Sequence, residues 1–359
     1  MAEGQLTEAA VQTVLAEFKD PETGRSVAEM GQVHDLRLHH GALSLTLALT
    51  THSAPLWRET QAELTELLRA RFTELKDVKV ELSVHHRPPA KLGQMGLMVK
   101  SVIAVGSGKG GVGKSTIATC LALALKRAGA SVGLMDADVY GPSVPHLLGI
   151  TAKPEARDGR ILPVEAAGMR VISMGFFVPA GEAVVWRGPM LHGAITQFLR
   201  DTLWGELDYL VIDMPPGTGD IALTLSQLLP LTGAVVVCTP QDLALLDAVK
   251  AIAMFRKVQI PVLGMVENMS YFLCPSCGKR YDIFGSGGAA RRAAELAIPF
   301  LGEVPIHISI RENGDAGQTS RDFDEPATAG FFEAICHRLV RNLADANRRK
   351  PPLPSLPVL

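Results

Sequence analysis

Cys274 and Cys277 are separated by two residues in the turn-rich stretch YFLCPSCGKRYDIFG, and no other cysteines in the chain have this spacing. A Cys-x-x-Cys pair offers two thiolates, whereas most metals that thiolates bind take four ligands. The other cysteines, Cys120, Cys238 and Cys336, fall within expected helices or a buried strand and are better explained as small core residues. A metal at the pair therefore needs further ligands from elsewhere.

A second candidate site is the glycine-rich stretch GSGKGGVGKST at residues 106–116. It contains the phosphate-loop pattern Gly-x-x-x-x-Gly-Lys-Ser, which begins at Gly108 and lies between an expected strand and an expected helix. Backbone N–H groups of such a loop surround phosphates, so we expect Lys114 to reach the β/γ oxygens and Ser115 to ligate Mg²⁺. The following helix directs the positive end of its dipole at the anion.

Acidic side chains follow two further apolar runs. LMDADVYGPS places Asp136 and Asp138 at the end of one expected strand, and LVIDMPPGTGD places Asp213 at the end of another. Carboxylates at the carboxyl edge of a parallel sheet face the ligand crevice. One carboxylate is needed behind Mg²⁺, and another can orient the attacking water. Asp220, in the turn after Asp213, is explained equally well as a capping residue.

The apolar runs around these sites indicate the fold class. From Val99 onward, the runs VIAVG, SVGLMD, YLVID, GAVVVC and PVLGMVEN alternate with helical segments. Buried parallel strands have this character, and strand–helix alternation predicts an α/β fold with a doubly wound, mostly parallel sheet. Together with the phosphate loop, this predicts a P-loop NTPase domain.

The first part of the chain predicts a separate small α+β domain. Apolar residues recur at helical spacing over residues 11–18 and 64–72, whereas residues 33–50 and 77–84 alternate as strands do. The polar segment HHRPPAKLGQMG is expected to be a linker. The predicted boundaries are an α+β domain at 1–85, a linker at 86–98, the P-loop domain at 99–345 and a Pro-rich tail at 346–359.

The composition favours a cytoplasmic protein. Charged residues make up 20% of the chain and the net charge is −2, which gives no reason to expect nucleic acid as a partner. We find no secretory signal at the N-terminus and no uncharged apolar stretch long enough to span a membrane. Five cysteines form an odd and sparse set, which argues for a reducing compartment and against a disulfide scaffold.

Lys109 adds a second cation to the phosphate loop. The stretch GKGGVGKST resembles the deviant Walker A class of P-loop ATPases, whose signature is Lys-Gly-Gly-x-Gly-Lys-Ser/Thr. In that class the extra lysine reaches across a dimer interface to the other chain's nucleotide, so the resemblance implies a homodimer that binds ATP. It also implies that Asp213 lies on the Mg²⁺ side, that Asp136 supports the metal and that Asp138 orients water.

The same class implies the rest of the nucleotide site. In related ATPases an asparagine at the end of a later strand, here Asn268, contacts adenine. The expected nucleotide contacts are Gly108, Lys109, Gly110, Gly111, Val112, Gly113, Lys114, Ser115, Thr116 and Asn268. The expected catalytic residues are Lys109, Lys114 and Asp138, and the expected Mg²⁺ residues are Ser115, Asp136 and Asp213.

A homodimer would also supply the missing metal ligands. Two copies of one Cys-x-x-Cys loop at a two-fold axis provide four thiolates, which can hold either a [4Fe–4S] cluster or a shared Zn²⁺. The sequence does not favour a thioredoxin-like redox pair, because Cys277 is followed by a glycine-rich loop.

From residue 99 to about residue 340 the chain resembles the Mrp/ApbC family of iron–sulfur cluster carrier ATPases. The shared landmarks are GKGGVGKST, DADVYGPSVPHLLG, WRGPM, DMPPGTGD, ENMS and CPSCG followed by FGSGGA. The N-terminal part resembles the small iron–sulfur assembly domain that bacterial members often carry. The resemblance implies a homodimer that holds a [4Fe–4S] cluster between Cys274 and Cys277 of both chains and transfers it to apo-proteins. ATP binding and slow hydrolysis would control loading or release.

Two departures from the pattern and two alternatives bear on this interpretation. Ala54 stands where small assembly domains frequently carry a cysteine, which argues against a thiol role for this module. The eukaryotic scaffolds carry an N-terminal cysteine cluster, and no cysteine precedes Cys120 here, so a bacterial-type carrier fits better. A positioning or partitioning ATPase shares GKGGVGKST, but it would need a basic amphipathic helix or a basic surface. An ATP-dependent dimer with a structural zinc stays open, because sites of four thiolates accept either centre.

Overall fold

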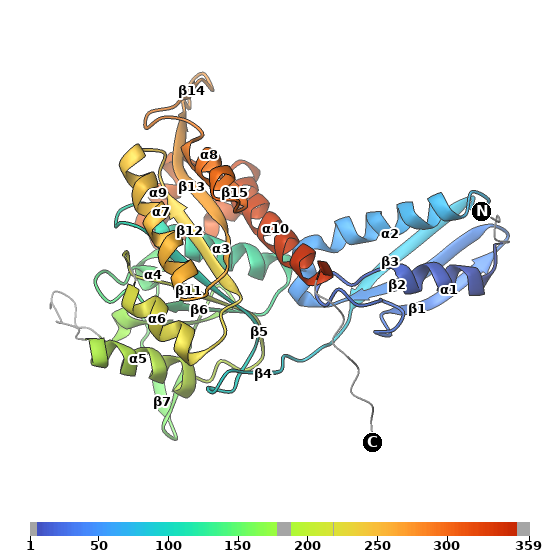
Figure 1. The fold of residues 1–359 in the computed structure, drawn as a ribbon, viewed down its shortest axis with the longest axis horizontal. Helices are drawn as coiled ribbons and strands as arrows, with labels where there is room; N and C mark the ends of the chain where they lie inside the picture. The colour runs from blue at the N-terminus through green and yellow to red at the C-terminus, as the bar shows by residue number, and fades with distance from the viewer. Residues whose placement is uncertain (1–5, 178–187, 218, 350–359) are drawn as a thin grey trace. The chain divides into compact units, whose positions relative to one another are not determined.

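The structure is a computed structural model that describes residues 6–177, 188–217 and 219–349 (Figure 1). Its contacts divide the chain into two compact units. The first unit runs to Arg87 and includes the chain again from Val340, and the second unit is Pro88–Leu339. Each unit has a hydrophobic core of its own.

The first unit is an α+β module with a three-stranded sheet in the order β1-β2-β3. Its elements are α1 (Glu8–Glu17), β1 (Val33–His39), β2 (Ala42–Leu49), η1 (Thr51–Leu56), α2 (Trp57–Arg71) and β3 (Asp77–Val84). The strand β2 pairs antiparallel with β1 and parallel with β3. This order of helices and strands confirms the predicted α+β fold.

Side-chain alternation along β2 explains the core of the module. The leucines at alternate positions are buried, as period two requires of a strand with one covered face. They are Leu43, Leu45, Leu47 and Leu49. The turn between β1 and β2 runs through His40 and Gly41, both with positive φ, as a tight hairpin connection needs.

The end of α10 (Pro326–Arg349) packs within the first unit. The guanidinium of Arg341 pairs with Glu59 and lies 3.0 Å from Glu63, both on α2. Asn347 Nδ2 donates a hydrogen bond of 2.7 Å to the carbonyl oxygen of Glu22. The module therefore combines residues from distant parts of the chain.

The second unit contains a mixed ten-stranded sheet in the order β14-β13-β12-β5-β11-β6-β10-β9, with β15 beside β13 and β4 beside β5. Its strands are β4 (Lys91–Leu92), β5 (Leu97–Ser107), β6 (Val132–Asp136), β9 (Val164–Ala166), β10 (Met169–Ser173), β11 (Leu207–Asp213), β12 (Gly233–Cys238), β13 (Val262–Leu273), β14 (Arg280–Tyr281) and β15 (Phe300–Ile306). All pairs are parallel except those of β4, β9 and β14. A short hairpin, β7 (Glu155–Arg157) and β8 (Arg160–Leu162), lies outside this sheet.

Helices alternate with the parallel strands, as the doubly wound fold predicts. They are α3 (Lys114–Ala128), α4 (Val144–Leu147), η2 (Met174–Phe176), α5 (Gly188–Asp201), α6 (Gly219–Leu228), α7 (Asp242–Lys257), α8 (Gly288–Glu295), α9 (Ile308–Asp315), η3 (Thr319–Phe323) and the first part of α10. Apolar side chains of α5 to α8 share one core with β5, β6, β11 and β12. The helix α3 packs against β5, β6 and β11. The predicted fold class is thus confirmed.

Strand order determines where the ligand crevice lies. The chain leaves β5 toward β6 on one side, and after β11 it continues to β12 on the other side of β5. In open α/β sheets ligands bind outside the carboxyl ends of the strands at such a change of direction. The loop after β5, which leads into α3, follows the strand at which this change of direction occurs.

The division into units differs from the sequence-based boundaries at two places. The expected linker contains β4, which pairs with the start of β5, and the chain from Val340 belongs with the first unit. The expected tail is helical to Arg349, and its residues 350–359 lie outside the described part of the chain.

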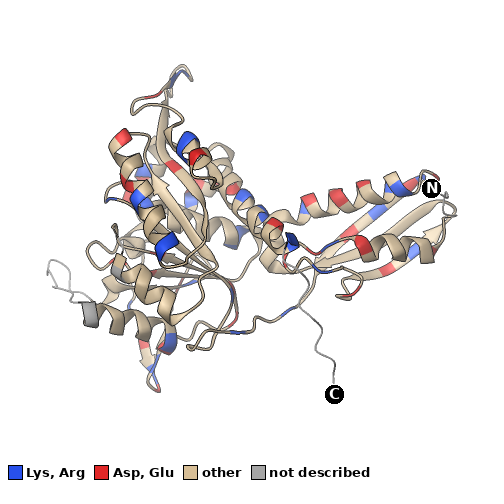
Figure 2. Cartoon of the chain, in the orientation of Figure 1, with Lys and Arg blue, Asp and Glu red and all other residues tan. Residues whose placement is uncertain are grey.

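Acidic and basic residues are mixed along two of the helices. Figure 2 marks residues of both kinds along α2 and α10. Within the described residues, no helix has both the length and the apolar character that crossing a membrane requires.

Candidate functional site

The phosphate loop connects β5 to α3 at the carboxyl edge of the sheet. Two of its glycines, Gly111 and Gly113, have φ of 80° and 78°, a conformation that glycine adopts without steric cost. Lys114 begins a helix of 15 residues, so its N-terminal N–H groups and dipole point at the loop. The half-buried side chains of Ser115 and Thr116 lie in its first turn.

Gly108 allows a close approach between the loop and α7. A Cβ atom on Gly108 would lie 2.1 Å from the carbonyl oxygen of Asp247, closer than side chains tolerate. The loop is also bound to β13, because Asn268 Nδ2 donates a 2.9 Å hydrogen bond to the carbonyl oxygen of Val112. The path of the loop is therefore held from two sides.

Lys114 is buried among carboxylates. Its Nζ lies 2.6 Å from Asp213 Oδ1 and 3.4 Å from Asp138 Oδ2, and it donates to Ser115 Oγ at 3.2 Å. The sheet explains this gathering, since Asp213 ends β11 and pairs in register with Asp136 at the end of β6. The structure thus brings together the lysine, the serine and the three predicted aspartates.

Asp136 is held by backbone and hydroxyl donors. Its carboxylate accepts hydrogen bonds from the N–H groups of Asp138 and Val144 and from Ser173 Oγ, at 3.1, 3.2 and 2.9 Å. Burial, followed by the neighbouring charge of Asp213, raises the pKa of Asp136 to about 7. Burial also raises the pKa of Asp213, and the ammonium group of Lys114 opposes that shift.

The site has the donors that Mg²⁺ prefers. Among the described side chains, Asp213 Oδ2 is one of the buried oxygens that have no hydrogen-bond partner. Ser115 Oγ and the carboxylate of Asp136 complete a set of hard oxygen ligands near the phosphate loop. These residues therefore fit the ion.

Asp138 is oriented toward the lysine of the phosphate loop. Its Oδ1 accepts hydrogen bonds from the N–H groups of Tyr140 and Gly141, at 3.2 and 3.3 Å, which leaves Oδ2 directed at Lys114.

Lys109, the other lysine of the phosphate loop, has no ion-pair partner for its ammonium group within the residues that the structure describes. Its carbonyl accepts a hydrogen bond from Ser107 Oγ at 2.9 Å. Its side chain is thus available to a ligand or to another chain.

Cys274 and Cys277 lie at the tip of a hairpin between β13 and β14. The N–H of Cys274 donates to the carbonyl of Lys279 at 3.0 Å, and the N–H of Gly278 donates to the carbonyl of Cys274 at 2.8 Å. At the base of the hairpin, the guanidinium of Arg280 lies 3.9 Å from the ring centroid of Tyr271. The local sequence thus forms a tight turn that exposes Cys277 and half-buries Cys274.

The Cys274 thiol differs chemically from the thiols of the three buried cysteines. The N–H groups of Ser276 and then Cys277 lower the pKa of the Cys274 thiol, which favours the thiolate that binds metals. Burial raises the thiol pKa of Cys238 to about 12 and also raises those of Cys120 and Cys336. The three latter cysteines are core residues, as predicted.

The hairpin does not complete a metal site by itself. Within the described ranges, no group of three or more His, Cys, Asp and Glu side chains is placed to hold a metal ion. Two thiolates on an exposed tip are half of the usual ligand set for soft centres. A complete site requires donors from outside this chain's described residues.

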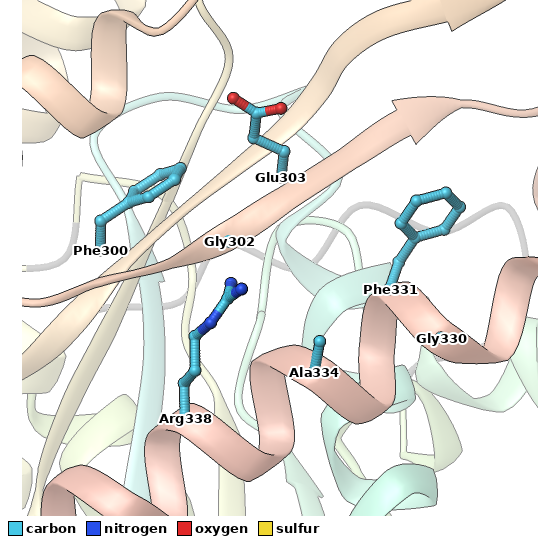
Figure 3. Close-up of a pocket in the computed structure, with 7 residues that line it drawn as sticks. All are labelled: Phe300, Gly302, Glu303, Gly330, Phe331, Ala334 and Arg338. Carbon is cyan, nitrogen blue, oxygen red and sulfur yellow. The ribbon is translucent and has the colours of Figure 1, made fainter.

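A cavity of about 370 Å³ lies elsewhere in the second unit, between β15 and α10 (Figure 3). Its lining is Phe300, Gly302, Glu303, Gly330, Phe331, Ala334 and Arg338. Arg338 donates to the carbonyl of Leu301 at 2.7 Å, and Glu303 lies 3.6 Å from Arg280. None of the predicted site residues lines it.

Several contacts of the site could not be read from the sequence. Ser173 lies far along the chain from Asp136, and no motif marks it. Glu267 is fully buried and accepts from Ser270 Oγ and from the N–H of Ala289. One signal was available for Glu267: it is a carboxylate at the end of the apolar run PVLGMV.

A strand, a glycine-rich loop and a helix that begins with a buried lysine define the second unit as a P-loop NTPase. Solved structures share this fold. The nucleotide-binding protein of Archaeoglobus fulgidus in complex with ADP matches with a TM-score of 0.57 and 42% identity, over 65% of this chain and 92% of that one. The cell division ATPase MinD of Pyrococcus furiosus matches with a TM-score of 0.50 and 22% identity, over 66% of this chain and 97% of its own.

The chain belongs to the family described as NUBPL iron-transfer P-loop NTPases, whose model matches residues 98–340. A second model, described as iron-sulfur cluster assembly protein, matches residues 8–82. The resemblance to the iron–sulfur cluster carrier family is thereby confirmed for both parts of the chain.

Curated relatives extend over most of the chain. The iron-sulfur cluster carrier protein of Deinococcus radiodurans is 45% identical over 340 residues, which are 93% of each chain. The protein of the same name from Escherichia coli K12 is 46% identical over 342 residues, 94% of this chain and 91% of its own.

Proposed function

We propose that this protein is an ATP-hydrolysing carrier that holds a [4Fe–4S] cluster between the chains of a homodimer and transfers it to apo-proteins in the cytoplasm. The observation that carries the proposal is the hairpin pair of half-buried Cys274 and exposed Cys277, with the pKa of the Cys274 thiol lowered, on a chain of the cluster carrier family. The curated relatives named iron-sulfur cluster carrier protein support it.

The phosphate loop would bind the nucleotide. Backbone N–H groups of residues 108–116 surround the phosphates, and Lys114 moves its ammonium group from Asp213 toward the β/γ oxygens. The ADP complex of the Archaeoglobus fulgidus relative supports this assignment. Asn268 lies beside the loop through Val112, and its proposed contact with adenine extends that role.

Mg²⁺ would neutralise charge that develops on the transferred phosphoryl group. Ser115 and Asp213 would hold the ion, and Asp136 would support it through the adjacent strand position. Asp138 is fixed by two N–H donors and would orient the attacking water. Lys109 of each chain would reach the nucleotide of the other chain, consistent with its lack of an ion-pair partner in the described structure.

The cluster is the cargo of the proposed carrier. Two hairpins that meet at a two-fold axis present four thiolates, the ligand number that a [4Fe–4S] cluster takes. Exposure of the hairpin tip leaves the thiolates accessible to a second chain and to an acceptor protein. ATP binding and hydrolysis would change the stability of this arrangement.

Anaerobic reconstitution with iron and sulfide tests the proposal. Wild type is expected to show the charge-transfer absorption of a [4Fe–4S] cluster with about four irons per dimer, and a mass per particle of two chains. Cys274→Ala and Cys277→Ala should abolish the absorption, whereas Cys336→Ala, at a buried position, should retain it. Tightly bound zinc without a labile cluster would overturn the carrier function and favour a zinc-linked dimer.

A further inference from the structure

One strand segment, residues 267–270 of β13, lies between the phosphate loop and the cysteine hairpin. The strand β13 ends at Leu273, and Cys274 follows directly. Figure 1 shows the connection from β13 to β14. Asn268 in the same segment binds the phosphate loop through the carbonyl of Val112. A single piece of backbone therefore contacts one site and leads into the other.

The contact with the phosphate loop is both polar and steric. The hydrogen bond from Asn268 Nδ2 to Val112 is 2.9 Å long. A Cβ atom on Gly113 would lie 2.1 Å from the same Nδ2, so any side chain at residue 113 would displace the Asn268 amide. A shift of residues 112–113 on phosphate binding therefore has to displace the Asn268 side chain.

The neighbouring residue, Glu267, contacts the chain before and after the hairpin. One carboxylate oxygen accepts from Ser270 Oγ at 2.6 Å, and the other accepts from the N–H of Ala289 at 2.7 Å. Ser270 precedes the cysteine hairpin and Ala289 follows it, in the first turn of α8. One fully buried carboxylate thus fastens both ends of the segment that carries the thiols.

The backbone between these contacts is irregular. Met269 has φ of +54°, which is uncommon for a residue with a side chain, and the register with β15 shifts between Asn268 and Phe272. Such a conformation persists only where its surroundings enforce it. The contacts of Glu267 and Asn268 provide that enforcement, so changing either one changes the path into the hairpin.

We propose that Asn268 and Glu267 are positioning residues that couple nucleotide binding at the phosphate loop to the spacing and accessibility of Cys274 and Cys277. The inference rests on the proposed function, in that it takes the loop to bind a nucleotide. Displacement of Val112 acts on Asn268, the irregular Met269 transmits it, and Glu267 converts it into a movement of the hairpin ends. If the bound nucleotide changes the metal affinity of the two thiols by some factor, linkage requires a bound metal to change the nucleotide affinity by that same factor.

The test measures how fast iodoacetamide alkylates Cys274 and Cys277 in full-length, metal-free protein, with and without saturating Mg-ADP. Peptide mass spectrometry resolves the two thiols, and the mass per particle is measured in both conditions so that equal oligomeric states are compared. Wild type is expected to change its rate by at least about fivefold on adding the nucleotide. In Glu267→Ala, the nucleotide should change the alkylation rate by less than about twofold, while the affinity of this variant for ADP stays close to that of wild type.

Matched variants separate positioning from general damage. Glu267→Gln keeps an acceptor for Ala289 and an amide that can donate to Ser270, so it should restore the nucleotide response. Glu295→Ala removes an exposed glutamate of α8 that pairs with Arg292, and it should respond as wild type does. Asn268→Asp removes the donor to Val112 and should lose the change in alkylation rate that the nucleotide causes. This variant is measured at an ADP concentration that saturates it.

Three outcomes decide the proposal. A Glu267→Ala protein with the full wild-type response overturns it, and so does a wild type whose thiols ignore the nucleotide at saturation. If Glu267→Ala lacks a cooperative unfolding transition, Ser270→Ala replaces it, and an undiminished response there is equally contrary. The assay uses neither iron nor sulfide, so a failed cluster reconstitution with an intact thiol response would sink the carrier function and leave the coupling standing.

Discussion

The ammonium nitrogen of Lys114 lies 2.6 Å from Asp213 Oδ1, so the lysine of the phosphate loop and the carboxylate proposed to lie beside Mg²⁺ form a buried ion pair. A phosphate that attracts Lys114 leaves Asp213 without its cation. Because a buried carboxylate without a counter-charge is costly, Asp213 then favours a divalent ion at the same place. Phosphate and metal are thus expected to bind together.

Lys114→Ala should lower the rate of ATP hydrolysis by at least about 100-fold, because the proposed stabilisation of phosphate charge is removed. Phosphate release under saturating Mg-ATP measures the effect. Lys257→Ala, at an exposed position of α7, is the control and should keep the wild-type rate. Full hydrolysis by Lys114→Ala would contradict the assignment of the loop.

Gly108→Ala should weaken ADP binding by at least about tenfold. The added Cβ would lie 2.1 Å from the carbonyl oxygen of Asp247, so the loop or α7 has to move. Calorimetric titration with Mg-ADP measures the affinity. Gly330→Ala is a suitable control, because a Cβ there would meet no atom within 4 Å. An unchanged affinity in Gly108→Ala would refute the close approach.

Asp322 should make the stability of the second unit depend on pH. Burial is the largest cause that raises its pKa to about 6, and the hydrogen bond from Asn313, 2.7 Å long, opposes the shift. The folded state therefore holds this proton more tightly than the unfolded chain does. The stabilisation is complete below the unfolded pKa, near 4, and is lost as the pH rises through about 6.

Urea unfolding measured between pH values of about 4.5 and 7.5 tests this pH dependence of stability. The range is roughly the one over which the shifted and unshifted carboxyl groups titrate. Wild type should lose about 1 kcal/mol across the range relative to Asp322→Asn, whose side chain does not titrate. Equal slopes in the two proteins would show that Asp322 has an ordinary pKa.

Arg341→Ala should reduce the free energy of unfolding of the first unit by about 1–2 kcal/mol. The Arg341 side chain is 25% exposed and pairs with both Glu59 and Glu63, so its loss removes a cation from beside two carboxylates, of which Glu63 keeps Arg348 at 3.4 Å. Arg311→Ala is the matched control, because Arg311 also pairs with two carboxylates but is 63% exposed, where such pairs contribute little. Equal effects of the two substitutions would argue against the packing of α10 on α2.

Local patterns in the sequence predicted the main features of the fold and the site. The phosphate loop, the aspartates at strand ends and the buried character of Cys120, Cys238 and Cys336 follow from spacing and periodicity over short stretches. The roles proposed for Lys109, Asp138 and Asn268 depend on family resemblance, and they stay predictions.

Long-range contacts could not be predicted in this way. The bonds of Ser173 to Asp136 and of Asn268 to Val112 join residues far apart in the sequence, and no local pattern specifies them. The same holds for α10. This helix is continuous, and nothing in its sequence indicates that its contacts change from the second unit to the first at Val340.

This last feature affects the order of events during synthesis. The first unit consists of residues that the ribosome releases early and a segment from Val340 that it releases after the whole P-loop unit. Domains made as one continuous stretch can finish folding as they emerge. Here the module that is translated first cannot reach its final set of contacts until the P-loop unit has been synthesised, so the N-terminal module cannot complete its folding while it is the only part of the chain that has emerged.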